Sequence, residues 1–327
     1  MSALLEVRNL QTHFFRKKQA IPAVDGVDIS IKKGETVALV GESGSGKSIT
    51  SLSIMGLVPS PGGKIVGGEI IFDGQDLVKF TENQLCKVRG NDISMIFQEP
   101  MTSLNPVLTI GEQITEVLIL HQKMSKTAAV KKAIEMLEMV GFSRAAQIIN
   151  DYPHRLSGGM RQRVMVAMAM SCNPKLLIAD EPTTALDVTI QAQILDLMKD
   201  LSHKFDTSIL LITHDLGVVS EVADRVVVMY CGQVVEEASV DDLFDEALHP
   251  YTVGLMNSIP SIDGDVSRLE SIKGNVPPPT NLPPGCRFAP RCPHAFDRCF
   301  AEIPTLEKKE GNRSVRCFLY DGKEAQA

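Results

Sequence analysis

Hydrophobic residues follow two different patterns over about the first 255 positions of the chain. Short runs rich in β-branched residues, at 36–40, 176–179 and 209–212, are almost continuously apolar. Such runs are typical of central parallel strands that are buried on both faces. Longer segments with helical spacing separate them, so the pattern predicts an α/β domain with a mostly parallel sheet. The strands expected are 4–8, 36–40, 70–72, 94–98, 176–180, 208–213 and 225–229.

The stretch between Thr109 and Asn150 has a different character, because it contains no strand pattern. Apolar residues recur there at spacings of four, three and three, with lysines and glutamates between them. They are Val130, Ile134, Leu137 and Val140. This spacing predicts an amphipathic helix, and we expect a helical subdomain inserted at about 100–172.

The composition changes again near the C-terminus. Eight of the 18 prolines lie between Pro277 and Pro304. Since proline fixes φ and removes a backbone donor, regular structure is not expected there. We therefore predict a large α/β domain at 1–258, a proline-rich linker at 259–284, and a small irregular module with four cysteines at 285–327.

Charge and hydropathy narrow the classes of function. The 327 residues include 33 Lys and Arg against 40 Asp and Glu, a formal net charge of −7. This balance argues against a surface that mainly binds nucleic acid. No apolar run approaches the roughly 20 residues that span a bilayer, and the first residues do not resemble a signal peptide. The sequence thus predicts a cytoplasmic protein, unless a partner holds it elsewhere.

A glycine-rich loop directly follows the strand predicted at 36–40 and precedes a helical run at 49–57. It fits the pattern G-x-x-x-x-G-K-[ST], in which backbone N–H groups and a helix N-terminus cradle phosphates. Its residues are Gly41, Glu42, Ser43, Gly44, Ser45, Gly46, Lys47 and Ser48. Lys47 can reach the β- and γ-phosphates of a nucleotide, and the Ser48 hydroxyl can bind Mg²⁺. The alternative, an ordinary Gly/Ser turn, does not require the strand before it or the helix after it.

Two carboxylates end the strand predicted at 176–180. Asp180 is placed to orient the Mg²⁺ shell through water, and Glu181 to polarise the water that attacks the γ-phosphate. The alternative is a pair of surface acids where a strand leaves the core. The phosphate loop favours the first interpretation.

The segment 156–163, Leu-Ser-Gly-Gly-Met-Arg-Gln-Arg, resembles the signature motif of the ATP-binding cassette (ABC) ATPases. Ser157 is a good N-cap, and Gly158 and Gly159 allow close backbone approach to a phosphate at a helix start. The resemblance implies that Ser157, Gly158, Gly159 and Met160 contact the ATP of a partner subunit in a head-to-tail dimer. Each ATP would then lie between one chain's phosphate loop and the other chain's signature.

Further motifs of the family stand in the expected order along residues 4–255. Gln98 is similar to the Q-loop glutamine, which approaches Mg²⁺ and the attacking water. Asp187 belongs to a segment that resembles the D-loop, and His214 matches the switch histidine that contacts the γ-phosphate. For Phe14 the resemblance implies a platform for adenine, although Phe15 stands next to it and a core phenylalanine is a rival interpretation. The resemblance thus implies Glu181, His214 and Gln98 as catalytic residues, with ATP and Mg²⁺ bound.

Segments 98–106, 183–193, 249–252 and 285–293 are similar to the ATPase subunits of oligopeptide and dipeptide importers. This resemblance implies a second, related ATPase subunit, two membrane-spanning subunits and an extracellular peptide-binding protein. It places the chain on the cytoplasmic face of the bacterial membrane. The alternatives are an importer ATPase for another solute such as nickel, a soluble cassette ATPase without a transport role, and a regulatory nucleotide-binding module. The last of these predicts a damaged catalytic set, which this sequence does not have.

Four cysteines lie near the C-terminus, separated by 5, 6 and 17 residues: Cys286, Cys292, Cys299 and Cys317. The region has few large apolar residues, and four thiolates on a metal centre would order it. Zinc sites favour closer pairs of cysteines, so the spacing favours a metal over the alternative of unliganded thiols but does not identify the metal. The resemblance to peptide importers implies a [4Fe–4S] cluster, with Zn²⁺ as the alternative.

Overall fold

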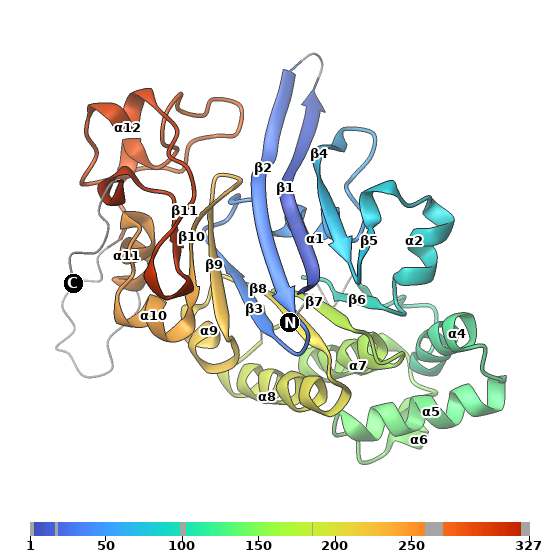
Figure 1. The fold of residues 1–327 in the computed structure, drawn as a ribbon. Coiled ribbons are helices and arrows are strands. Elements are labelled where there is room, and N and C mark those ends of the chain that lie inside the picture. The colour runs from blue at the N-terminus through green and yellow to red at the C-terminus, as the bar shows by residue number, and fades with distance from the viewer. Residues whose placement is uncertain (1–2, 17–18, 99–102, 185, 259–270, 322–327) are drawn as a thin grey trace. The chain divides into compact units, whose positions relative to one another are not determined.

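The computed structural model describes residues 3–16, 19–98, 103–184, 186–258 and 271–321 (Figure 1). The chain forms two compact units. The first consists mainly of Ile31–Thr36 and Lys79–Ile212, and the second of Ala3–Ser30, Val37–Val78 and Thr213–Ala327. The predicted α/β class with parallel strands is confirmed in both units.

Parallel strands form the centre of the first unit. Their order is β8 (Ser208–Thr213), β7 (Leu176–Asp180) and β6 (Ile93–Ile96), and β7 is parallel to both neighbours. Every residue of β7 and β8 is buried, as expected for strands covered on both faces. Asp180 is therefore held at a fixed point, the last residue of a central strand.

The remainder of the first unit is mostly helical, as the sequence predicted for the stretch after Thr109. Its helices are α2 (Glu82–Val88), α4 (Ile110–Gln122), α5 (Lys126–Met139), α6 (Ala145–Ile148), α7 (Gly158–Met170) and α8 (Val188–Phe205), with a 3₁₀ turn at Pro153–Arg155. On α5 the buried face is centred on Ala129, Ala133, Met136 and Leu137. Two of the predicted core residues, Val130 and Ile134, are only half-buried. The predicted helix is confirmed, but its alanines, which the hydrophobic pattern ignored, occupy the core.

Two groups of strands form the second unit. One has the order β2 (Gln19–Lys32), β1 (Ala3–Arg16), β4 (Gly63–Phe72) and β5 (Gln75–Asp76). The other has the order β3 (Thr36–Val40), β9 (Arg225–Tyr230), β10 (Gln233–Ser239), β12 (Ser314–Val315) and β11 (Glu307–Lys308). Strand β3 is parallel to β9, whereas β10, β12 and β11 are antiparallel additions. The C-terminal strands thus extend the sheet that carries the phosphate loop.

The helices of the second unit are short. They are α1 (Lys47–Ile54), α9 (Leu216–Val222), α10 (Val240–Asp245), α11 (Pro250–Met256) and α12 (Asp297–Ala301), with 3₁₀ turns at Leu77–Lys79, Ala289–Arg291, Glu310–Asn312 and Phe318–Tyr320. The turn at Leu77–Lys79 begins in this unit and ends at the first residue of the other.

Although regular structure was not expected in the proline-rich region, short elements form there because aromatic packing anchors it. The ring of Phe288 lies 5.3 Å from that of Tyr230 and 5.4 Å from that of Tyr251, between ring centroids. All three side chains are fully buried, in one core with strands β3 and β9. The predicted domain boundaries at 258 and 284 stay predictions. Residues 259–270, the first part of the predicted linker, and 322–327 lie outside the described residues.

Candidate nucleotide site

The phosphate loop joins the end of β3, at Val40, to the start of α1, at Lys47. Gly46 is the N-cap of α1 with φ 103°, and Gly41 has φ 149°, conformations that favour glycine. A Cβ at Gly41 would lie 2.2 Å from the carbonyl oxygen of Met229, and one at Gly46 would lie 2.6 Å from that of Ala23. The loop therefore needs glycine at both positions for steric reasons, in addition to any contact with phosphate.

The Lys47 side chain is buried over the loop. Its Nζ donates to the carbonyl oxygens of Gly41, at 2.7 Å, and Glu42, at 3.1 Å. Ser45 is also buried, and its carbonyl oxygen accepts from the N–H of Gly232 at 2.8 Å. The strand, loop, helix and ammonium group predicted for phosphate binding thus form one preorganised structure in the second unit.

Glu42, the second residue of the loop, has partners that the sequence did not indicate. Its backbone N–H donates to the hydroxyl of Tyr251 at 2.8 Å, and its carboxylate accepts from the guanidinium of Arg291. Tyr251 stands in α11, and Arg291 in the C-terminal region. Both residues lie in segments that resemble the peptide-importer subunits, 249–252 and 285–293, but nothing in the sequence connects either of them with the phosphate loop. Sequence reasoning therefore missed their contacts with Glu42.

Gln98 and Glu181 are joined in the first unit. The amide nitrogen of Gln98 donates to a carboxylate oxygen of Glu181 at 2.8 Å, and the hydroxyl of Thr184 donates to the same oxygen at 2.9 Å. Glu181 has φ 48°, which is strained for a residue with a side chain. Its N–H donates to the carbonyl oxygen of Ile212 on β8 at 2.8 Å, which fixes this conformation. The two residues predicted to handle the attacking water therefore form one hydrogen-bonded group beside the buried Asp180.

The signature segment forms the start of α7. The side chain of Ser157 is the N-cap and accepts from the N–H of Met160 at 3.3 Å, as predicted. A Cβ at Gly159 would lie 2.7 Å from the Ile190 side chain, whereas one at Gly158 would make an ordinary contact at 3.6 Å with Leu186. Gly159 thus serves packing against α8, and Gly158 does not need glycine for steric reasons.

The D-loop aspartate has a structural role of its own. The Asp187 side chain accepts from the N–H of Ile190 at 2.9 Å and caps α8. Ala185, also part of the predicted D-loop, lies outside the described residues, as do residues 99–102 after Gln98. The side chains of Leu186 and Ile190 lie next to Gly158 and Gly159, close to where a Cβ would stand, so the signature lies beside this loop.

His214 and Phe14 belong to the second unit. His214 is exposed and is followed by Asp215, the side chain of which caps α9. Phe14 is half-buried, since its ring reaches Gly63, while the neighbouring Phe15 is 45% exposed. The nucleotide roles of both residues stay predictions. The residues predicted for the nucleotide site belong to both units. The second unit contains the phosphate loop, Phe14 and His214, and the first contains Gln98, Asp180, Glu181, the signature and Asp187.

The donor groups suit ATP with Mg²⁺. Magnesium prefers hard oxygen ligands, and the predicted set offers the Ser48 hydroxyl, the Gln98 side chain and the carboxylate of Asp180. Phosphate would be bound by the backbone N–H groups of the loop and by Lys47, at the N-terminus of α1.

The prediction of a [4Fe–4S] cluster or zinc at the four cysteines is wrong. Among the described residues, which include all four, no group of three or more His, Cys, Asp or Glu side chains could hold a metal ion. The cysteines do line one cavity, but it measures about 20 Å³, which is room for one water molecule. Burial raises the pKa of the thiols of Cys286, Cys292 and Cys317, the last to about 11. The four side chains pack with Phe288, Ala289 and Phe318 as small apolar groups.

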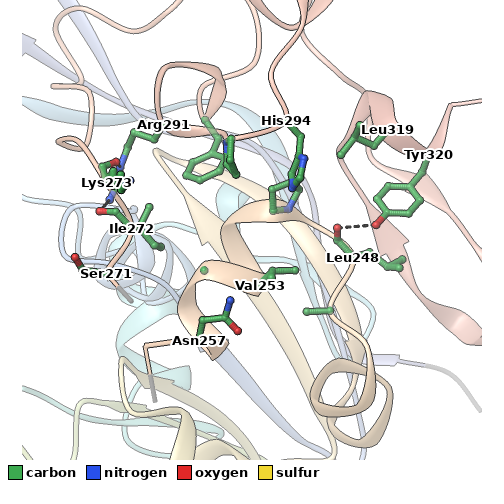
Figure 2. A pocket seen from close by; sticks show the side chains of 15 residues that line it. Leu248, Val253, Asn257, Ser271, Ile272, Lys273, Arg291, His294, Leu319 and Tyr320 are labelled. Atoms are coloured by element: carbon green, nitrogen blue, oxygen red, sulfur yellow. Dashed lines mark hydrogen bonds between the residues drawn. The ribbon is translucent and has the colours of Figure 1, made fainter. Parts of the chain in front are cut away.

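A larger cavity of about 470 Å³ lies between α11 and the C-terminal region (Figure 2). Its lining includes Val253, Ile272, His294 and Tyr320, and the Tyr320 hydroxyl donates to the carbonyl oxygen of Leu248 at 2.8 Å. None of the predicted nucleotide residues lines it, so we do not assign the nucleotide to this cavity. In the described part of the chain, no helix has the length and hydropathy required to cross a membrane.

Two family models match the chain. One, described as ABC transporter, matches residues 24–184, and the other, described as oligopeptide/dipeptide transporter, C-terminal region, matches residues 235–299. Among curated proteins, the oligopeptide transport ATP-binding protein AppD of Bacillus subtilis is 73% identical over 326 residues, covering 100% of this chain and 99% of AppD. The dipeptide transport ATP-binding protein DppD of the same organism is 49% identical and covers 100% of this chain and 98% of DppD.

Solved structures agree with these matches. The ATP-binding cassette MJ0796, solved as a dimer in a post-hydrolysis state with ADP and Pi, has a TM-score of 0.65 at 31% identity, covering 72% of this chain and 98% of that one. The structure of cbiO1 from Clostridium perfringens, part of the ABC transporter complex cbiONQ, has a TM-score of 0.64 at 25% identity, covering 75% and 92%.

Proposed function

Because this chain belongs to the ABC transporter family of ATPases, we propose that it hydrolyses ATP to power the uptake of oligopeptides or dipeptides through a membrane importer. The phosphate loop carries the ATPase part of this proposal, since its glycines, its buried Lys47 and its place between β3 and α1 match the demands of nucleotide binding. The peptide part is supported by the relatives AppD and DppD and by the match at 235–299.

The roles of the side chains follow from their chemistry. Lys47 would neutralise the β- and γ-phosphates, and Ser48 would bind Mg²⁺, with Gln98 and Asp180 completing its surroundings. Glu181 would orient and deprotonate the attacking water, because it is a carboxylate already held by Gln98 at 2.8 Å. His214 would contact the γ-phosphate.

We also propose that hydrolysis requires two ATPase subunits. The signature helix starts at an exposed Ser157, and MJ0796 forms a dimer. ATP would lie between one subunit's phosphate loop and the other subunit's signature. A ligand shifts an equilibrium only by its differential affinity, so ATP must bind the closed dimer more tightly than the open one. The second subunit would be a related, non-identical chain.

The remaining partners follow from the same proposal. Two membrane-spanning subunits would hold this chain at the cytoplasmic face of the membrane, and an extracellular peptide-binding protein would deliver the substrate. The chain would contact the transporter through the helical segment at about 100–172. We retain 1–258 as the nucleotide-binding part, 259–284 as the linker and 285–327 as the C-terminal module.

The test is purification of the intact complex with its membrane subunits and its peptide-binding protein, followed by measurement of ATP hydrolysis in lipid vesicles. We expect short peptides to stimulate hydrolysis and to accumulate in the vesicles. With the Lys47→Ala complex, we expect neither stimulated hydrolysis nor accumulation of peptide. Stimulation by Ni²⁺ instead of peptides would assign the chain to an importer of another solute. Hydrolysis that needs no membrane subunits and ignores every solute would contradict a transport role.

A further inference from the structure

An ion pair connects the phosphate loop with the C-terminal region of the same unit. Two nitrogens of the Arg291 guanidinium donate to the two carboxylate oxygens of Glu42, at 2.6 and 3.1 Å. The Arg291 side chain is only 4% exposed, and that of Glu42 is 30% exposed. A two-point arginine–carboxylate pair that is largely withdrawn from water has a fixed geometry, unlike most surface ion pairs.

Arg291 is itself held in place by the groups around it. Its Nε donates to the carbonyl oxygen of Lys273 at 3.2 Å, and one terminal nitrogen donates to the hydroxyl of Tyr230 at 3.3 Å. The guanidinium also lies over the rings of Tyr230 and Phe288, 5.8 and 5.9 Å from their centroids. Figure 2 shows Arg291 beside Lys273 and Ile272 at the edge of the large cavity. The hydrogen bonds with Glu42 raise the pKa of Arg291, so the positive charge is permanent.

The other end of the loop is supported from the same segment. Arg287 pairs with Asp25 and donates to the carbonyl oxygen of Cys231. The next residue, Gly232, donates to the carbonyl oxygen of Ser45 in the loop at 2.8 Å, and its own carbonyl accepts from Asp25. Two arginines four positions apart thus support the loop near both ends.

The charge of Glu42 gives this arrangement a consequence for ATP. The residue follows Gly41, the carbonyl oxygen of which accepts from Lys47 at 2.7 Å. A free carboxylate at this position would repel a polyphosphate and would compete with it for the Lys47 ammonium. Arg291 neutralises the carboxylate and fixes it on the side of the C-terminal region.

We propose that Arg291 is a positioning residue for ATP binding, acting through Glu42. It prevents the carboxylate of the phosphate loop from opposing the phosphates. This inference rests on the proposed function, because it assumes that the loop binds ATP. It makes the C-terminal region part of the structure that sets the affinity for nucleotide.

The test compares the affinities of the purified full-length chain for MgATP, MgADP and adenosine by isothermal titration. Arg291→Gln should raise the Kd of MgATP on the order of 10-fold, between the small effect of breaking an exposed ion pair and the larger effect of breaking a fully buried one. The effect should be smaller for MgADP and absent for adenosine. In Glu42→Gln/Arg291→Gln the Kd of MgATP should return to within about 3-fold of the original, because the repelling charge is gone.

Arg298→Gln is the matched control. Arg298 is an arginine of the same region, paired with Glu302 and Asp321, but it does not contact the phosphate loop. It should leave all three affinities unchanged. If Arg291→Gln alters the three ligands equally, if the double variant is no better than the single one, or if Arg291→Gln changes nothing, the proposal is overturned. A different result would contradict the proposed function itself: the unsubstituted chain would then show no binding of MgATP.

Discussion

The phosphate loop and the signature segment are two helix starts with similar residues and different surroundings. In the loop, a glycine in a left-handed conformation caps α1, and Ser45 and Lys47 are buried. In the signature, the side chain of Ser157 caps α7, and this residue is exposed. The loop buries Ser45 and Lys47 and leaves its tip, Ser43 and Gly44, exposed. In the signature only the cap Ser157 is exposed, and Gly158, Gly159 and Met160 are half-buried without a buried ammonium group among them.

The difference indicates which parts of the reaction one chain can perform alone. A loop whose lysine and backbone are already held in place by its own unit can bind phosphate without help, since its groups are oriented in advance. A helix start with an exposed cap also attracts anions, but it carries no such lysine and needs another molecule to exclude water. We therefore expect variants at the loop to alter binding and variants at the signature or at Glu181 to alter turnover.

The largest effect is expected for Glu181→Gln. Loss of the base should lower ATP turnover by roughly 10²- to 10⁴-fold, while an amide oxygen can still accept from Gln98, so ATP binding should persist. The loss of turnover is measured with the assembled transporter, and the unchanged affinity for MgATP is measured by titration. Glu138→Gln, at an exposed position of α5, is the control. Unchanged turnover in Glu181→Gln would exclude this residue as the base.

The next largest effect should come from Gly158→Asp. A Cβ has room at this position, and an aspartate in the first turn suits the helix dipole, so thermal stability should be retained. A carboxylate facing the partner's ATP would nevertheless cost on the order of 10²-fold in turnover, through like-charge repulsion. Affinity of the isolated chain for MgATP should not change. A fall in that affinity would mean that the signature contributes to its own chain's site.

For Lys47→Ala we expect the Kd of MgATP to rise about 10- to 10²-fold, the range for losing hydrogen bonds from a charged group. Lys64→Ala, at an exposed position of β4 in the same unit, should bind normally. Titration of both purified variants with MgATP measures the two Kd values. Equal affinities in the two variants would remove the loop from the nucleotide site.

The smallest effect concerns the pH dependence of stability near the loop. His249 is the N-cap of α11, which carries Tyr251, and its Nδ1 accepts from the N–H of Tyr251 at 3.0 Å. Burial lowers the pKa of His249 to about 3, well below the ordinary 6.5. Because the folded state resists protonation, this contribution to stability is complete above about pH 6.5 and is lost as the pH falls toward 3.

At pH 5.5 the loss should reach about 1 kcal/mol relative to pH 7. His249→Asn keeps a good N-cap without a titrating ring, so its free energy of unfolding should change less between these two pH values. Denaturant unfolding at pH 7 and 5.5 measures both differences. Equal differences in the original chain and the variant would show that another group controls the acid sensitivity.

Patterns in the sequence were sufficient for the central strands, but not for strands that break the pattern. Strands β3, β7 and β8 begin and end where predicted, because buried parallel strands are continuous apolar runs. Strand β10 was missed, since it contains two glutamates. One of them, Glu236, is fully buried and accepts from the N–H groups of Leu248 and His249, which compensates for the loss of water.

The candidate site was predictable where a motif specifies backbone geometry. The loop glycines and the Ser157 cap are of this kind, because their local conformation requires these residue types. Tyr251 and Arg291 were not predictable, since they reach Glu42 from 209 and 249 positions away and only the fold brings them there. The metal at the cysteines, in contrast, was predicted but is wrong. The spacing of cysteines in a sequence cannot distinguish a set of metal ligands from thiols packed among aromatic rings.

The pairing of Glu42 with Arg291 has a practical side for protein engineering. A chimera that combines the nucleotide-binding residues of one importer with the C-terminal region of another would separate two charges that are matched within a single chain. Such hybrids should be designed with positions 42 and 291 inherited from the same parent, and with Asp25 and Arg287 treated as a second inseparable couple.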